Sequence, residues 1–365
     1  MNKCYLPELS SVEELDFNYN NQLDKLNLFH TKVKDQIEII LGQTYVLPDV
    51  ITAFGEFSRI LWPMVNPAID FADGQMKEKD MTNKYDIYDK YFEVSRITKM
   101  SSGQFVQQYL DTSAELISEF QYTSMSRGEI AYMLKAWEAA NEIILKDKTP
   151  SGSVTFDNVN DTSVPKDNDE RAIYRWKLAH HGFAVFMIFS AYCFNNATKG
   201  IQDGGDEEEI ADWLDKGAHL FRATTACMEF GNSFTATVYR GVIRPDMSRA
   251  NDEANLPNGF SGTQNFDYIQ WRKAKNALLK VIKEHKEKGL LSEKIMNGAE
   301  MFRTYYLEDM HIHSIIAGRM VGLEKSLLQA GIPGRPGGKP IKLTAGDVLR
   351  SMAKMREKET EFIME

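Results

Sequence analysis

Two histidines lie two residues apart in the apolar segment 301–329, MFRTYYLEDMHIHSIIAGRMVGLEKSLLQ. A helical period of about 100° per residue predicts one long helix over this segment. One apolar stripe of that helix contains Phe302, Tyr306, His313, Ile316, Met320, Leu323 and Leu327. His311 falls about 200° away, on the face with Glu308. We therefore expect only His313 to face the interior, either as a core histidine bonded to a carbonyl or as a ligand of a metal centre.

Further candidates for chemistry are His180, in the apolar segment 172–198, and two arginines in YRGVIRP, Arg240 and Arg244. A guanidinium group is a planar fork that binds both oxygens of a carboxylate. The same arginines could equally bind the carbonyls at a helix C-terminus. The carboxylate of Asp309, one turn before His313, is a candidate acceptor for the second ring nitrogen of that histidine.

Four motifs in chain order resemble the active site of tryptophan 2,3-dioxygenase. The first is His180-His-Gly-Phe183-Ala-Val-Phe186-Met187, and the second is Tyr239-Arg240-Gly-Val-Ile-Arg244-Pro245. The third is Gly259-Phe-Ser-Gly-Thr-Gln264, and the fourth is HSIIAGRMVG from His313, followed by a glycine-rich loop. The resemblance extends over roughly Arg171–Arg350, with soft boundaries. The helical segment before residue 171 looks more like the N-terminal domain of indoleamine 2,3-dioxygenase and monodechloroaminopyrrolnitrin synthase.

The resemblance implies a b-type heme whose iron is bound by His313, with Arg319 beside the cofactor. It implies a catalytic position for His180 over the heme, and Arg240 as the partner of a substrate carboxylate. The remaining substrate-binding positions that it implies are Arg244, Tyr239, Phe183, Phe186, Met187, Phe260 and Ser261. Arg240 or Arg244 could instead bind a heme propionate. Because segment 301–330 contains no cysteine, we expect no covalent attachment of heme there.

The sequence departs from the family at two places. The loop Pro333-Gly-Arg-Pro-Gly-Gly338 lacks the threonine with which the family contacts the substrate ammonium group. Phe183 and Phe186 replace a tyrosine and a tryptophan, so the pocket wall is more apolar. A substrate other than tryptophan is therefore credible.

We predict an oxidoreductase, a heme-dependent oxygenase that uses dioxygen on an indole or another aromatic substrate derived from an amino acid, most simply a dioxygenase. One alternative is a heme-dependent tyrosine-type hydroxylase that uses peroxide, since such enzymes belong to the same superfamily. A non-catalytic heme sensor would need His313 but not Arg240. A di-iron site built on Glu308 and His311 is the least favoured alternative, because that fold needs a second Glu-x-x-His motif.

The composition is that of an ordinary globular protein, with 43% hydrophobic and 26% charged residues. A net charge of −9 disfavours nucleic-acid or anionic-membrane partners. The longest apolar run, Gly182–Phe194, is shorter than the roughly 20 residues of a membrane span. Three scattered cysteines favour a reducing compartment, so we expect a soluble, cytoplasmic protein; nothing indicates its oligomeric state.

Helical periodicity dominates the chain, and the predicted fold is all-α, a helical heme domain preceded by a smaller helical domain. We predict helices over 50–62, 104–122, 124–145, 172–198, 211–240, 263–285 and 344–365. The polar segment 146–170 predicts a boundary. The expected domains are 1–150 and 171–365, joined by a linker at 151–170.

Overall fold

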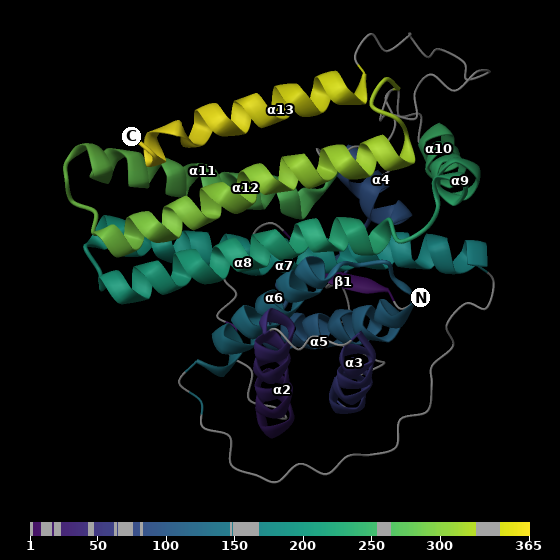
Figure 1. The fold of residues 1–365 in the computed structure, drawn as a ribbon, viewed down its shortest axis with the longest axis horizontal. Coiled ribbons are helices and arrows are strands. Elements are labelled where there is room, and N and C mark those ends of the chain that lie inside the picture. Colours follow the sequence, from purple (N-terminus) through teal and green to yellow (C-terminus); the bar gives the residue numbers. More distant parts are fainter. Residues whose placement is uncertain are drawn as a thin grey trace. The chain divides into compact units, whose positions relative to one another are not determined.

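The computed structural model describes residues 3–8, 17, 23–42, 47–61, 64, 76–80, 83–146, 148, 168–253, 264–325 and 344–365 (Figure 1). The chain forms two compact units, each assembled from several segments. The first unit comprises 1–79, 92–185 and 226–233, and the second comprises 80–91, 186–225 and 234–365. The predicted division at 151–170 stays a prediction, since 151–167 lie outside the described residues.

Among its described residues, the first unit is mainly helical and has two short strands. β1 (Cys4–Pro7) pairs in parallel with β2 (Val94–Ile97), with Cys4 opposite Val94. Its helices are α2 (Leu23–Leu41), α3 (Leu47–Leu61), α5 (Ser102–Glu119), the 3₁₀ turn η2 (Phe120–Tyr122) and α6 (Arg127–Leu145). Helix α2 packs against α3 and α6. The sequence sets where α5 and α6 begin, because each starts with a capping box that satisfies otherwise unpaired N–H groups.

Two long helices contribute to both units. Helix α7 (Asn168–Asp203) gives residues 168–185 to the first unit and 186–203 to the second. Helix α8 (Glu207–Gly231) gives 207–225 to the second unit and 226–231 to the first. The predicted helix at 172–198 is confirmed and is longer at both ends. Glu207–Glu209 form the first turn of α8, where carboxylates interact favourably with the helix dipole.

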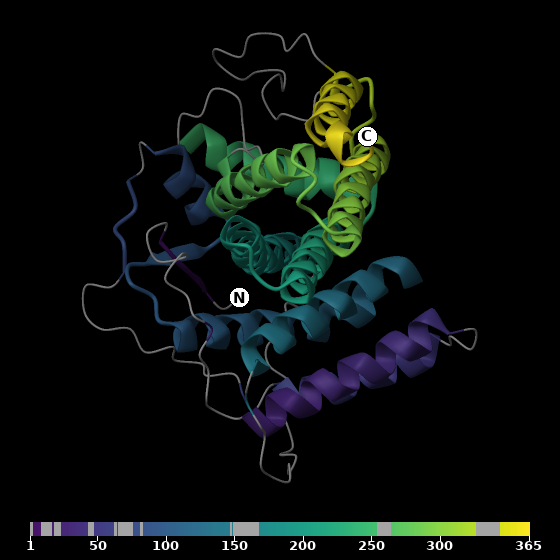
Figure 2. The same ribbon diagram turned by 90° about the vertical axis from the view of Figure 1, so that its left-hand side faces the viewer.

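The second unit is a helical bundle. Its elements are α4 (Lys84–Tyr91), α9 (Ala236–Val238), the π-helical turn η3 (Tyr239–Ile243), α10 (Arg244–Glu253), α11 (Phe266–Glu287), α12 (Glu293–Met320), α13 (Ala345–Thr360) and the 3₁₀ turn η5 (Glu361–Ile363). Helices α12 and α13 lie side by side in both views (Figures 1 and 2). Aromatic rings fill the space between α11 and α12, where Trp271 lies 6.3 Å from Phe302.

The prediction of one continuous helix over 211–240 is wrong. Helix α8 ends at Gly231, and a new helical segment begins at Ala236 with Thr235 as its cap. Pro245 lies in the first turn of α10, where no N–H is needed from it. Residues 247–253 therefore belong to α10, and the segment 254–263 lies outside the described residues.

The predicted helix 301–329 is displaced toward the N-terminus. Helix α12 begins at Glu293 and ends at Met320. Gly322 has a φ of +98°, which favours glycine, and its N–H donates to the carbonyl of Ala317, so the chain leaves the helix there. Leu323 is consequently 42% exposed instead of continuing the apolar stripe, and Leu327 lies outside the described residues.

The all-α prediction is confirmed, with β1 and β2 as a minor addition. Cys4, Cys193 and Cys227 are buried and form no disulfide with one another. In the part of the chain that the structure describes, no helix is both long and apolar enough to cross a membrane.

Candidate functional site

The two histidines of α12 face different surroundings, as predicted. His311 is exposed, whereas His313 is half-buried on the face that carries the buried side chains of Tyr306, Ile316 and Met320. Burial lowers the pKa of His313, an effect that nearby Asp309 partly opposes. Neither ring nitrogen of His313 takes part in a hydrogen bond with another described residue. A neutral imidazole with an available lone pair therefore lies on the inner face of α12.

Asp309 is near His313 but does not orient it. One carboxylate oxygen accepts a hydrogen bond from Thr225 Oγ1 at 2.8 Å, and the other accepts from Arg356 Nη1 at 2.7 Å. Both oxygens are thus used by α8 and α13. The predicted acceptor role of Asp309 toward His313 has no hydrogen bond to support it among the described residues.

Glu308, the carboxylate of the Glu-x-x-His alternative, is held by an arginine. The Nε and Nη2 groups of Arg222 donate to its two oxygens at 2.8 and 3.0 Å. Among the residues that the structure describes, no three His, Cys, Asp or Glu side chains gather as a metal site would need. Glu308 thus joins α12 to α8 as the partner of Arg222.

The second unit brings the Arg240 motif to the end of the helix that carries His313. Arg240 is an exposed residue of the π-helical turn η3, and its Nε donates to the carbonyl of Met320 at 3.1 Å. Met320 is the last residue of α12. The structure therefore shows the arrangement expected of an arginine at a helix C-terminus.

Tyr239 and Arg244 lie together beside Arg240. Tyr239 is 7% exposed and stacks on Phe234, with ring centroids 6.4 Å apart. Burial raises the pKa of the Tyr239 phenol, and the charge of Arg244 opposes that rise. The start of α10 is fixed by a hydrogen bond of 2.9 Å from the Tyr91 hydroxyl of α4 to Asp246. Single π-helical turns often occur at functional sites.

His180 belongs to the first unit, in a closely packed environment. Its Nδ1–H donates to the carbonyl of Trp176 at 2.7 Å, and its ring stacks on Phe92 at 3.9 Å. Because a carbonyl only accepts, Nδ1 carries the proton and Nε2 carries the lone pair of the neutral ring. Burial lowers the pKa of His180 to about 4, so the ring is neutral at physiological pH.

The other predicted pocket residues are distributed over both units. Phe183 is half-buried in the first unit, and Phe186 and Met187 are buried in the second, each 1% exposed. Arg319 is exposed in the last turn of α12. Phe260, Ser261 and the loop 333–338 lie outside the described residues. The structure therefore brings together Tyr239, Arg240 and Arg244 near the end of α12.

The stability of the protein should depend on His181. This residue is 2% exposed, and its Nε2–H donates to the carbonyl of Phe92 at 2.6 Å. Burial lowers its pKa from 6.5 to about 4. Between these values the unfolded chain binds more protons than the folded protein, so the free energy of unfolding falls as pH falls from 6.5. The loss is about 3 kcal/mol at pH 4 for one such imidazole.

Urea unfolding of wild type and His181→Gln across pH 4 to 7 tests this dependence. Glutamine keeps an N–H donor without titrating, so the variant should lose less stability on acidification than wild type. Identical pH dependence in the two proteins would contradict the prediction.

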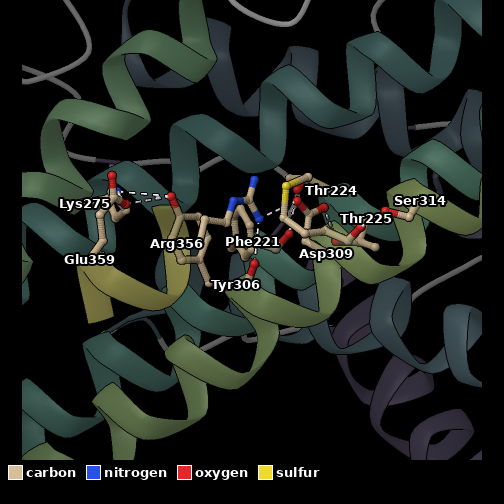
Figure 3. A network of polar contacts seen from close by, with 10 residues as sticks. Phe221, Thr224, Thr225, Lys275, Tyr306, Asp309, Ser314, Arg356 and Glu359 are labelled. Atoms are coloured by element: carbon tan, nitrogen blue, oxygen red, sulfur yellow. Dashed lines mark hydrogen bonds and ion pairs between the residues drawn. The ribbon is translucent and has the colours of Figure 1, made fainter. Parts of the chain in front are cut away.

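The sequence did not reveal a buried polar network between α11, α12 and α13, shown in Figure 3. Arg356 is 3% exposed and donates to Asp309 and to the carbonyl of Tyr306. Lys275 is 1% exposed and donates to Glu359 at 2.6 Å and to the Tyr306 hydroxyl at 3.2 Å. Arg356 and Glu359 lie in the charged segment MREKETE. Nothing in the sequence distinguishes these two buried or partly buried residues from the exposed charged residues beside them.

His313 has the chemistry that a heme ligand needs. Heme iron takes an axial ligand from the lone pair of a neutral imidazole, and the porphyrin supplies the other four nitrogens. His313 offers such an imidazole, because its pKa is lowered by burial and its nitrogens make no hydrogen bond within the described ranges.

Comparison with known proteins identifies the family. Residues 59–291 match the family model described as SfmD 3-methyl-L-tyrosine peroxygenase, which is more than half of the chain. The match includes His180, Arg240 and Arg244, whereas His313 lies beyond its end. No curated protein and no solved structure matched the chain. On the strength of the family match, the chain belongs to the SfmD 3-methyl-L-tyrosine peroxygenase family of heme-dependent oxidoreductases.

Proposed function

We propose that this protein is a heme-dependent peroxygenase that hydroxylates the ring of a tyrosine-type amino acid with hydrogen peroxide as oxidant. The observation that carries the proposal is the family match over 59–291. It favours the peroxide-dependent alternative over the main prediction, a dioxygenase of an indole substrate. The missing threonine in the loop 333–338 agrees with a substrate other than tryptophan.

His313 is the proposed axial ligand of the heme iron. Its neutral, half-buried imidazole on the inner face of α12 supports this role. When bound, heme would supply the oxygen-transfer chemistry, and the protein would supply placement and exclusion of water. Arg319, exposed in the last turn of α12, is the proposed partner of a heme propionate.

His180 is the proposed catalytic group. Its Nδ1–H is fixed on the carbonyl of Trp176, which leaves the lone pair on Nε2. In that tautomer Nε2 is a proton acceptor, and the proton would come from peroxide or from a substrate phenol. Nε2 can act as a proton donor only after this transfer. The stacking on Phe92 holds the ring in one orientation, as a group that accepts a proton at a defined place requires.

The substrate carboxylate is the proposed partner of Arg240, with Arg244 as the second candidate. Arg240 is exposed, and only its Nε is engaged by the carbonyl of Met320 among the hydrogen bonds described above. Its terminal nitrogens project from the fixed Nε position at the end of the His313 helix. Tyr239, Phe183, Phe186, Met187, Phe260 and Ser261 are the proposed wall of the aromatic pocket.

Arg240→Leu should weaken substrate binding while heme content stays normal. Loss of a charge-assisted hydrogen bond costs about 1.5–3 kcal/mol. Substrate titration followed by the heme absorption spectrum measures the change. Arg240→Lys is the matched control, because it keeps the charge but not the fork. If Arg240→Leu binds substrate normally and loses heme, the residue is a propionate partner.

The proposed reaction is tested with isotopically labelled oxidants. The heme-loaded protein is mixed with tyrosine or 3-methyltyrosine and ¹⁸O-labelled hydrogen peroxide, and the product is analysed by mass spectrometry. One labelled oxygen in a ring-hydroxylated product is the expected result. Two atoms from labelled dioxygen in an indole product would restore the dioxygenase prediction. Binding of small gas ligands without turnover of any substrate would favour the heme sensor.

A further inference from the structure

The hydroxyl of Tyr306 lies between a buried cation and a partly exposed carboxylate. It donates to Glu359 Oε2 at 3.1 Å and accepts from Lys275 Nζ at 3.2 Å (Figure 3). The tyrosine is 2% exposed, whereas the side chain of Glu359 is 30% exposed. A proton released by the phenol therefore has an acceptor in contact with it, and that acceptor reaches water.

Two cations flank the ring of Tyr306. The guanidinium of Arg356 lies 4.1 Å and the ammonium of Lys275 lies 4.9 Å from the ring centroid. A positive charge beside the ring opposes formation of a phenol radical cation, because the two charges repel. Oxidation of this tyrosine is thus favoured only when the proton leaves together with the electron, and Glu359 is placed to receive it.

The position of Tyr306 connects it with the proposed heme ligand. Tyr306 and His313 lie on one face of α12, seven residues apart, which corresponds to about 10 Å along the helix axis. The indole of Trp271 lies 6.0 Å from Tyr306, and the half-buried ring of Tyr268 follows at 5.9 Å. A continuous series of oxidisable rings thus extends from Tyr306 toward solvent.

We propose that Tyr306 is a redox-active residue that reduces the oxidant of the enzyme by one electron when no substrate is bound. This proposal rests on the proposed heme at His313. In the step, Tyr306 gives one electron to a one-electron oxidant formed from hydrogen peroxide, and its phenolic proton moves to Glu359. The product is a neutral tyrosyl radical, and the oxidant is reduced by one electron. The heme and the pocket are thereby protected from self-oxidation.

Freeze-quench electron paramagnetic resonance tests the proposal. The heme-loaded full chain, produced with ring-deuterated tyrosine to identify the signal, is mixed with hydrogen peroxide without substrate. Wild type should give a tyrosyl signal, and Tyr306→Phe should lose it, because phenylalanine keeps the ring and its packing without the O–H group. Tyr306→Phe should also lose its heme absorption faster under peroxide. Glu359→Gln should form the radical more slowly.

Two other tyrosines, Tyr305 and Tyr91, serve as matched controls. Tyr305 has a guanidinium over its ring, that of Arg222 at 4.0 Å, but Arg222 instead of a carboxylate contacts its hydroxyl. Tyr91 donates to a carboxylate, Asp246, but belongs to α4. Tyr305→Phe and Tyr91→Phe should keep the signal. An unchanged radical in Tyr306→Phe, or its loss in either control, would overturn the assignment.

A second arm separates this proposal from the assignment of heme. The protein without heme is oxidised by flash-generated trivalent ruthenium tris-bipyridine, a soluble one-electron oxidant. A radical that depends on Tyr306 and forms more slowly in Glu359→Gln would support the tyrosine even if heme binding fails. Equal radical yields in wild type and Tyr306→Phe in this arm would refute it. Thermal unfolding of each variant shows that it is folded.

Discussion

His313→Ala should abolish the Soret absorption of the heme-loaded protein. The histidine offers the neutral imidazole on the inner face of α12, and alanine leaves no lone pair for the iron at that position. The measurement is the absorption spectrum and heme content after reconstitution. We expect loss of the iron–imidazole bond to outweigh every other single change in the cofactor site.

His311→Ala is the matched control for this variant. The two histidines are two residues apart on the same helix, but His311 is exposed. Its replacement should leave the Soret band unchanged. If His311→Ala loses the band while His313→Ala keeps it, the axial ligand is misassigned and the Glu308–His311 pair regains interest as a metal site.

Arg356→Met should strongly destabilise the folded protein. Arg356 and Asp309 form an ion pair with side-chain exposures of 4% and 9%, at 2.7 Å. Removal of one partner leaves a buried carboxylate without its counter-ion, which typically costs about 3–5 kcal/mol. Methionine keeps much of the aliphatic stem, so the loss reports on charge more than on packing. Urea unfolding followed by circular dichroism gives the free energy of unfolding.

Arg222→Met provides the comparison. Arg222 of α8 pairs through two hydrogen bonds with Glu308 of α12, the neighbour of Asp309 in the sequence, but the two side chains are 21% and 28% exposed. A pair that is open to water typically contributes about 0–1 kcal/mol, so this variant should be only mildly affected. The double variant Arg356→Met with Asp309→Leu should recover stability relative to Arg356→Met alone. Equal losses in the two single arginine variants would contradict the argument from burial.

The helical fold and the inward face of His313 could be predicted because they depend on local sequence. The helical period of 3.6 residues places His311 and His313 on different faces of α12, independently of contacts with distant segments. Capping boxes at Ser101 and Ser126 likewise act within four residues and define where α5 and α6 begin.

What could not be predicted depends on contacts between distant segments. Arg356 is one of several charged residues in a polar helix, and only its pairing with Asp309, 47 residues away, distinguishes it. The π-helical turn at Tyr239–Ile243 has no periodic signature, and Pro245 is tolerated just after it because the following helix begins at Arg244. The resemblance supplied the candidate site residues, and their roles stay predictions. The preference for peroxide as oxidant comes from the family match, whose description is that of a peroxygenase.

The course of α7 and α8 through both compact units has a consequence for protein engineering. A break in the chain at 151–170 would leave the first unit without residues 171–185 and 226–233. No single cut yields one complete unit, because each unit is built from separated stretches of sequence. Truncated fragments should therefore express as incompletely folded chains, whereas two fragments produced together could complement each other. Split-protein reporters and circular permutants of this enzyme would be better opened in the short turn between these two helices, at Gly204–Asp206, where the residues are exposed.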